Sequence, residues 1–151
     1  MRILVLNGPN LGSLGRRQPE IYGTTTLAEI ENDLQAQAVA LGVDLRFEQS
    51  NHEGTLIDLI EEETGRCQAC VINPGALAHT SLALADALRG FTGPVVEVHL
   101  SNILAREEYR RTSHVAAAAA AVITGAGASG YGLALRTAVQ LVGGNTTEPS
   151  K

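Results

Sequence analysis

The chain has 151 residues, of which 44% are hydrophobic and 3% are aromatic, and its formal net charge is −5. This length predicts one domain with a single core of Leu, Val, Ile and Ala side chains. The negative charge and the lack of a basic block exclude nucleic acid or an anionic membrane as the main partner. An apolar run of about 18 residues and a signal peptide are both absent from the sequence, so we expect a cytoplasmic protein.

Short apolar runs alternate with longer helical patterns along the chain. The predicted strands are residues 2–7, 43–49, 69–73, 94–99 and 120–124. The predicted helices are residues 27–41, 54–64, 80–89 and 131–142, with a shorter one at 105–111. This alternation indicates βαβ units and hence an α/β fold. We expect a flavodoxin-like three-layer sandwich with a five-stranded parallel sheet.

Local signals mark one helix start and the end of the domain. Thr26 and Glu29 form a capping pattern just before the helix predicted at residues 27–41. Residues 144–151 lack hydrophobic periodicity and are predicted to be a disordered tail. We therefore expect one flavodoxin-like domain at residues 1–143.

Polar side chains gather after the predicted strands rather than inside them. In an open parallel sheet, ligands bind at the carboxyl ends of the strands, where these residues would meet. Three of the four histidines lie at this edge. The polar residues after the first four strands include Asn7, Asn10, Arg16, Arg17, Tyr22, Ser50, Asn51, His52, Glu53, Asn73, His79, Glu97, His99, Ser101, Asn102, Arg106 and Arg110. This pattern predicts an active-site cleft.

Glu97 and His99 stand two residues apart on the fourth predicted strand, so their side chains point to the same face. A carboxylate beside an imidazole fixes the tautomer of the ring and favours its protonated form. His99 is therefore a candidate general acid. The alternative is a strand-end histidine that only satisfies a neighbouring group.

Tyr22 lies in a glycine-rich loop close to Arg17 in the sequence. A phenol is a poor base at pH 7, but one guanidinium about 4 Å from a phenolate supplies roughly 4 kcal/mol at an effective dielectric of 20. Arg17 is thus sufficient in principle to make Tyr22 a base. Gly12, Gly15 and Gly23 would let the loop open and close as a lid. The alternative is a surface or interface ring.

Two other motifs have simpler interpretations. Cys67 and Cys70 form one C-x2-C pair, but zinc needs about four ligands, so we expect a reduced pair at a strand entrance. Residues 125–130 spell GAGASG, which matches the dinucleotide pattern G-x-G-x-x-G. Too few residues follow for another strand and its ribose-binding acid, so we expect a tight turn that packs a helix against the sheet.

Five separated motifs occur in order: NGPNLGSLGRRQPEIYG, QSNHEG, INPGALAHTS, EVHLSNILAREEYRR and GYGLAL. Together they resemble the type II 3-dehydroquinate dehydratase (type II dehydroquinase) family, over about residues 3–142. The resemblance implies a catalytic flavodoxin-like subunit, commonly assembled as a homo-oligomeric dodecamer of trimers. It also implies a hydro-lyase of the shikimate or quinate pathway without metal or organic cofactor. The implied reaction is anti elimination of water from 3-dehydroquinate, through an enolate, to 3-dehydroshikimate.

The resemblance further implies roles for individual residues. Tyr22 would take the proton from the carbon beside the ketone, with Arg17 holding it as phenolate. His99, oriented by Glu97, would protonate the departing hydroxyl, and Asn10 would stabilise the enolate oxygen through a water. The implied binding residues are Asn73, Leu100 and Ser101 for the carboxylate, His79 and Arg110 for the ring hydroxyls, Arg106 as a second lid or cleft arginine, and Asp86 as an acid reaching a neighbouring subunit's site.

The lysine content bears on the mechanism independently of the resemblance. A covalent route to this dehydration forms a Schiff base on a buried lysine, and the only lysine is Lys151 in the polar tail. An imine mechanism is therefore nearly excluded. The positions that depart from the commonest family pattern are Gly12, Gln18, His114 and Ser129. None of them has a predicted chemical role, but the first two bear on lid mobility.

Two other functions stay open at the level of sequence. One is a flavin- or nucleotide-binding module, in which the first loop would cradle phosphate and Tyr22 would stack on a ring. The other is a catalytically inactive homologue kept as an oligomeric scaffold. The intact set of Asn10, Arg17, Tyr22, Glu97 and His99 argues against the second.

Overall fold

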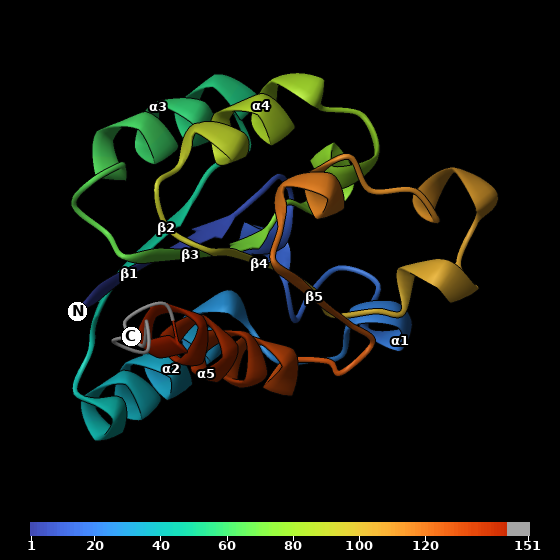
Figure 1. Cartoon of the computed structure of the whole chain (residues 1–151). Coiled ribbons are helices and arrows are strands. Elements are labelled where there is room, and N and C mark those ends of the chain that lie inside the picture. Colours follow the sequence, from blue (N-terminus) through green and yellow to red (C-terminus); the bar gives the residue numbers. More distant parts are fainter. Residues whose placement is uncertain (145–151) are drawn as a thin grey trace.

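The computed structural model describes residues 1–144, which form a five-stranded parallel sheet flanked by helices (Figure 1). The strands are β1 (Arg2–Asn7), β2 (Asp44–Gln49), β3 (Ala69–Asn73), β4 (Val95–His99) and β5 (Ala121–Thr124). Their order in the sheet is β2-β1-β3-β4-β5, and all pairs are parallel. The predicted α/β class and flavodoxin-like strand order are confirmed, although three strands begin one residue later than predicted.

Helices cover both faces of the sheet (Figure 1). The longer helices are α2 (Leu27–Leu41), α3 (Glu53–Glu63), α4 (Leu82–Gly90) and α5 (Ser129–Gly144). Successive residues of β1 point to opposite faces: Val5 packs in the core that α2 and α5 cover, whereas Leu4 and Leu6 pack in the core that α3 and α4 cover. Strands buried on both faces need apolar residues at most positions, which is why β1, β3 and β4 appear in the sequence as mainly apolar runs.

The predicted cap of α2 is confirmed. Thr26 Oγ1 accepts a hydrogen bond from the Glu29 N–H at 3.2 Å, and Glu29 Oε2 accepts one from the Thr26 N–H at 2.9 Å. These two bonds satisfy backbone donors that the first turn of a helix leaves free. They also fix the exit of the glycine-rich loop that precedes the helix.

The prediction of a helix at residues 105–111 is wrong. This segment forms two separate 3-10 turns, η3 (Ile103–Ala105) and η4 (Glu108–Arg110). Arg106 lies between them with an extended backbone, at φ −96° and ψ −164°, so an α-helix cannot continue through it. The remaining 3-10 turns are η1 (Leu11–Ser13), η2 (Gly75–His79) and η5 (Val115–Ala118).

A short helix, α1 (Pro19–Tyr22), lies where the sequence predicts only a loop. Pro19 has the φ that suits the first helical position, and Gly23 follows the last turn with φ 79°. Four residues are too few to produce a hydrophobic period, so only this proline and glycine signal could have revealed the helix.

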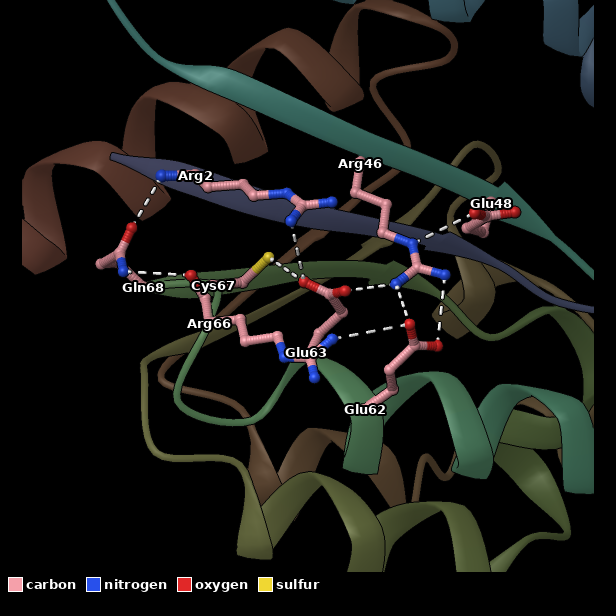
Figure 2. A network of polar contacts seen from close by, with 8 residues as sticks. All are labelled: Arg2, Arg46, Glu48, Glu62, Glu63, Arg66, Cys67 and Gln68. Atoms are coloured by element: carbon pink, nitrogen blue, oxygen red, sulfur yellow. Dashed lines mark hydrogen bonds and ion pairs between the residues drawn. The ribbon is translucent and has the colours of Figure 1, made fainter.

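A buried carboxylate holds together the amino edge of the sheet (Figure 2). The side chain of Glu63, at the end of α3, is only 1% exposed. Its Oε1 accepts a hydrogen bond from Arg46 Nη1 on β2, while its Oε2 lies 3.0 Å from the Cys67 sulfur and 3.7 Å from Arg2 Nη1. Burial opposes ionisation of this carboxyl, but the contacts with Cys67, Arg46 and Arg2 outweigh it and hold the pKa of Glu63 below its ordinary value.

The cysteine pair belongs to this network rather than to a reactive site. Cys67 and Cys70 are both free and buried. Burial, together with the hydrogen bond to Glu63, raises the pKa of the Cys67 thiol to about 12, and burial also raises that of Cys70. Both thiols therefore stay protonated and unreactive at neutral pH, as the predicted reduced pair requires.

Replacing Glu63 with glutamine should lower the free energy of unfolding by about 2–3 kcal/mol at pH 7, because charged hydrogen bonds lose their anionic acceptor. The lowered pKa of Glu63 stabilises the fold above the unfolded-state value near 4.3, and this contribution disappears as the pH falls through the folded-state value. The difference between wild type and E63Q, measured by urea unfolding, should therefore shrink in acid.

Glu62→Gln is the matched control for this prediction. Glu62 also contacts Arg46, at 3.0 Å, but its side chain is 48% exposed. Its loss should cost less than about 1 kcal/mol. Equal losses in the two variants would contradict a special contribution from the buried carboxylate.

Two findings concern the ends of the fold. Within residues 1–144, no helix has the length and apolarity needed to cross a bilayer. Helix α5 includes Gly144, and the rest of the predicted tail, residues 145–151, lies outside the described residues.

Candidate active site

Most of the predicted site residues line one cleft at the carboxyl edge of the sheet. The space in this cleft that is not filled by protein atoms, including the part open to solvent, is about 630 Å³. The predicted residues that line it are Asn10, Arg17, Tyr22, Asn73, His79, His99, Leu100, Ser101, Arg106 and Arg110. Leu11, Leu14 and Ile103 supply apolar walls. The cleft therefore combines cationic, amide and imidazole groups on a partly apolar surface.

Tyr22 reaches the cleft from the last position of α1. Arg106 Nη1 donates a hydrogen bond to the Tyr22 hydroxyl at 2.8 Å. The guanidinium carbons of Arg106 and Arg17 lie 5.3 Å and 5.9 Å from the centre of the Tyr22 ring. Two positive charges thus flank this phenol, and the one bonded to its oxygen is Arg106 rather than the predicted Arg17.

Arg106 owes this position to the interrupted segment after β4. Its side chain is only 14% exposed, and Nε lies 3.5 Å from Glu107 Oε2. The backbone at Arg106 is extended, so this residue is not part of a helix that would continue from η3 to η4. No local pattern in the sequence indicates that this arginine meets a tyrosine 84 residues earlier.

Asn10 is held in an unusual backbone conformation at the start of the same loop. Its φ is 68°, in the left-handed region that asparagine tolerates better than most residues. Its N–H donates to Asn51 Oδ1 at 3.0 Å, and Gln49 Nε2 donates to the same oxygen at 3.1 Å and to the Gly8 carbonyl at 3.2 Å. Gln49 at the end of β2 and Asn51 just after it therefore fix the loop that carries Asn10.

The predicted Glu97 and His99 pair is present at the end of β4. His99 Nε2 lies 2.5 Å from Glu97 Oε1. Glu97 is completely buried beneath the cleft, whereas His99 is 5% exposed and lines it. Because the carboxylate occupies Nε2, the other ring nitrogen, Nδ1, is left to act on a ligand.

His79 lies beside His99 with its ring fixed by the backbone. The two ring centres are 6.3 Å apart, and the rings are inclined by 20°. His79 Nδ1 lies 2.8 Å from the Thr112 carbonyl oxygen, which can only accept, so Nδ1 must carry the proton of this bond. Nε2 is therefore the nitrogen that can bind a ligand, in keeping with the predicted contact to a hydroxyl.

A buried chain of hydrogen bonds supports the floor of the cleft. The Tyr131 hydroxyl, on α5, donates to Asn7 Oδ1 at 2.6 Å and accepts from Asn73 Nδ2 at 3.0 Å. Asn73 Oδ1 in turn accepts from the Gly75 N–H at 3.2 Å, and Asn7 Nδ2 donates to the Glu48 carbonyl at 3.1 Å. This chain links the ends of β1, β2 and β3 and fixes the amide of Asn73. Burial raises the pKa of Tyr131, which keeps its hydroxyl protonated.

The GAGASG turn supports the segment that contains Leu100 and Ser101. Gly125 and Gly127 have φ values of 86° and 60°, and the Gly127 N–H donates to the Leu100 carbonyl at 2.9 Å. The N–H of Ser101 belongs to the same planar peptide and therefore points away from that bond. A Cβ on Gly130 would lie 3.2 Å from Val98, so helix and strand pack closely here. The predicted tight turn is confirmed.

Asp86 lies apart from the cleft of its own chain. It is on α4, with a side chain that is 73% exposed, and Oδ1 lies 2.8 Å from Arg89 Nη1. It borders an outer groove between α3 and α4 together with Ile57 and Ile60. Its predicted role needs a neighbouring subunit and remains a prediction.

The fold and the cleft define a class of enzyme. The sheet is parallel and covered by helices on both faces. The cleft at its carboxyl edge is lined by a phenol between two cations and by an imidazole held by a buried carboxylate. This arrangement is typical of an acid–base enzyme that acts on a small anionic molecule.

Comparison with known proteins places the chain more narrowly. The model of the family "Dehydroquinase class II" matches residues 1–139, and the chain belongs to this family. It is 55% identical over 137 residues to 3-dehydroquinate dehydratase 2 of Agrobacterium fabrum, covering 91% of this chain and 93% of the relative. It is 52% identical over 142 residues to catabolic 3-dehydroquinase 2 of Aspergillus flavus, covering 93% and 95%.

A solved structure agrees with this assignment. The type II dehydroquinase from Propionibacterium acnes superimposes with a TM-score of 0.87 at 46% sequence identity, covering 90% of this chain and 94% of that one. The fold and the family predicted from the sequence are therefore both confirmed.

Proposed function

We propose that Tyr22 is the base and His99 the acid of a dehydration carried out in this cleft. The chain is a 3-dehydroquinate dehydratase, a hydro-lyase of either biosynthetic or catabolic type. The observation that carries the assignment of base and acid is their placement in one cleft, each in contact with a charged side chain, Arg106 for Tyr22 and Glu97 for His99.

The first proposed step is removal of the proton from the carbon beside the ketone of 3-dehydroquinate. Tyr22 accepts this proton as phenolate, and the guanidinium groups of Arg106 and Arg17 stabilise the phenolate charge. The electron pair of the broken C–H bond moves onto the carbonyl oxygen, which gives an enolate. Asn10, which lines the cleft and is held by Asn51, stabilises the enolate oxygen through a water.

The second proposed step expels the hydroxyl as water. As the enolate re-forms the ketone, the C–O bond on the next carbon breaks and His99 Nδ1 donates a proton to the departing oxygen. The product is the conjugated enone 3-dehydroshikimate. Base and acid come from different elements, α1 and the end of β4, and the proposed elimination is anti and needs no metal or organic cofactor.

The substrate carboxylate is proposed to bind at the ends of β3 and β4. Asn73 and the backbone N–H groups of Leu100 and Ser101 form this site, which the Tyr131 chain and the glycine turn hold in place. His79 Nε2 and Arg110 bind ring hydroxyls. Arg110 Nε lies 3.2 Å from Glu107 Oε2 and lines the same cleft.

The proposed mechanism is tested by trapping. The protein is incubated with 3-dehydroquinate and borohydride, separated from both, and given fresh substrate while the ultraviolet absorbance of the enone is followed. Full activity is expected, because no imine forms. Inactivation would show a Schiff base and overturn the mechanism. A protein that is inactive before treatment and carries a flavin or nucleotide spectrum would instead support a binding module.

Three wider properties are part of the same proposal. Residues 1–143 act as one catalytic domain in the cytoplasm. Subunits assemble as a homo-oligomer, a dodecamer of trimers, in which Asp86 of one subunit reaches the cleft of the next. Sedimentation velocity on the purified protein measures this state.

A further inference from the structure

Two hydrogen bonds converge on one oxygen of the buried Glu97. Oε1 lies 2.5 Å from His99 Nε2 and accepts a second bond from the Ser113 hydroxyl at 2.6 Å. The other oxygen, Oε2, is buried and has no hydrogen-bond partner within residues 1–144. Both side-chain hydrogen bonds to this carboxylate are therefore made at Oε1, the atom that contacts the His99 imidazole.

The direction of the Ser113 bond is fixed by its other contact. Ser113 Oγ accepts a hydrogen bond from the Ala116 N–H at 3.1 Å, at the start of η5. A hydroxyl has one proton to donate, and any proton carried by Glu97 Oε1 lies on its bond to His99 Nε2, so toward Ser113 this oxygen can only accept. Ser113 therefore donates to Glu97, and its oxygen is held in place by the backbone.

A proton between Glu97 and His99 can reside on either partner. Burial and the unpartnered Oε2 favour a neutral carboxylic acid beside a neutral imidazole. A second hydrogen bond to Oε1 favours the carboxylate and hence the imidazolium. The difference matters because the Nδ1–H of an imidazolium is a far stronger acid than that of a neutral imidazole.

We propose that Ser113 is a positioning residue that keeps this proton on His99 by holding Glu97 as a carboxylate. The proposal rests on the proposed function, in which His99 protonates the departing hydroxyl. Ser113 does not line the cleft and acts only through Glu97. It extends the acid from a pair of residues to three.

The test compares Ser113→Ala with a closely matched serine. Ser81 also donates to a glutamate, Glu53, and its oxygen accepts the Leu84 N–H at 2.9 Å at the start of α4. Loss of either hydroxyl removes one helix cap and one Ser–Glu bond. Only S113A should lower kcat, by roughly tenfold with KM changed less than about twofold, whereas S81A should keep the wild-type kcat. Ser113→Thr, which restores a hydroxyl, should recover most of the rate.

A second readout follows the proton without any turnover. In S113A, the ¹⁵N resonances of the His99 ring should move from imidazolium toward neutral imidazole values at a pH where the wild type is active. The proposal fails if S113A and S81A lower the melting temperature equally while S113A changes neither kcat nor the ring signals. Ser113 would then be only a helix cap. Should S113A not fold, Ser113→Cys keeps the size with a weaker donor and gives the same comparison.

The two readouts separate this proposal from the proposed function. Ring signals that move while kcat stays at the wild-type value would show that Ser113 controls the proton but that His99 is not the acid. Ring signals that stay constant while a His99 variant loses activity would leave the acid assigned and remove Ser113 from its control.

Discussion

Tyr22→Phe should lower kcat by about three orders of magnitude while 3-dehydroquinate still binds. The phenylalanine ring keeps its place between Arg17 and Arg106, but it has no oxygen to accept the proton from the carbon beside the ketone. The loss should therefore fall on the chemical step rather than on binding. Enone absorbance gives kcat, and calorimetry of substrate binding gives Kd.

Tyr109→Phe makes the same chemical change outside the cleft. Tyr109 lies on η4 and is 67% exposed. Removal of its hydroxyl should leave kcat within about twofold of wild type. A wild-type kcat in Y22F would remove Tyr22 from the role of base. A large loss in both variants would point to an unspecific effect of losing a phenol.

His99→Ala should also stop dehydration, with kcat lower by about two to four orders of magnitude. The alanine variant leaves the buried Glu97 with only the Ser113 hydroxyl as a hydrogen-bond partner and should lose stability as well. His99→Gln separates the two effects, because an amide can still donate a hydrogen bond to Glu97 but cannot supply an acidic proton. Both variants are compared with His52→Gln, which changes an exposed histidine outside the cleft and should keep wild-type activity.

Exchange of substrate protons with solvent distinguishes the acid from the base. In heavy water, H99Q should still replace the proton beside the ketone of 3-dehydroquinate with deuterium, as seen by NMR, because Tyr22 can form the enolate. Y22F should show neither exchange nor dehydration. Rapid dehydration by H99Q would assign the acid to another group.

The fold was predictable because its local signals agree with one another. The buried strands are mainly apolar runs with polar residues near their carboxyl ends, and α2 begins at a capping box that the sequence displays. The errors fall where the backbone departs from regular structure. Arg106 breaks a segment whose composition suits a helix, and α1 is too short to show a period.

The site was predictable only in part, because its residues come together through the fold. Glu97 and His99 could be paired from the sequence, since a strand places alternate residues on one face. Three other hydrogen bonds could not be predicted, because they join residues that are distant in sequence or lie in irregular turns. They are Arg106 to Tyr22, Asn73 to Tyr131 and Ser113 to Glu97. The GYGLAL motif marked Tyr131 as part of the resemblance, but only the structure shows what its hydroxyl contacts.

The Tyr131 chain bears on how easily this enzyme could acquire a new substrate. A side chain suited to another ligand at position 73 would leave the Tyr131 hydroxyl without its donor, beneath a floor with almost no solvent access. Tyr131 could be replaced only if Asn7 changed too, because Asn7 Oδ1 would lose the hydrogen bond that the Tyr131 hydroxyl donates to it. A shift in specificity at this point of the cleft therefore passes through intermediates with unpaired buried polar groups. Natural variation is expected at the lid, where residues change singly, and coordinated change at positions 7, 73 and 131.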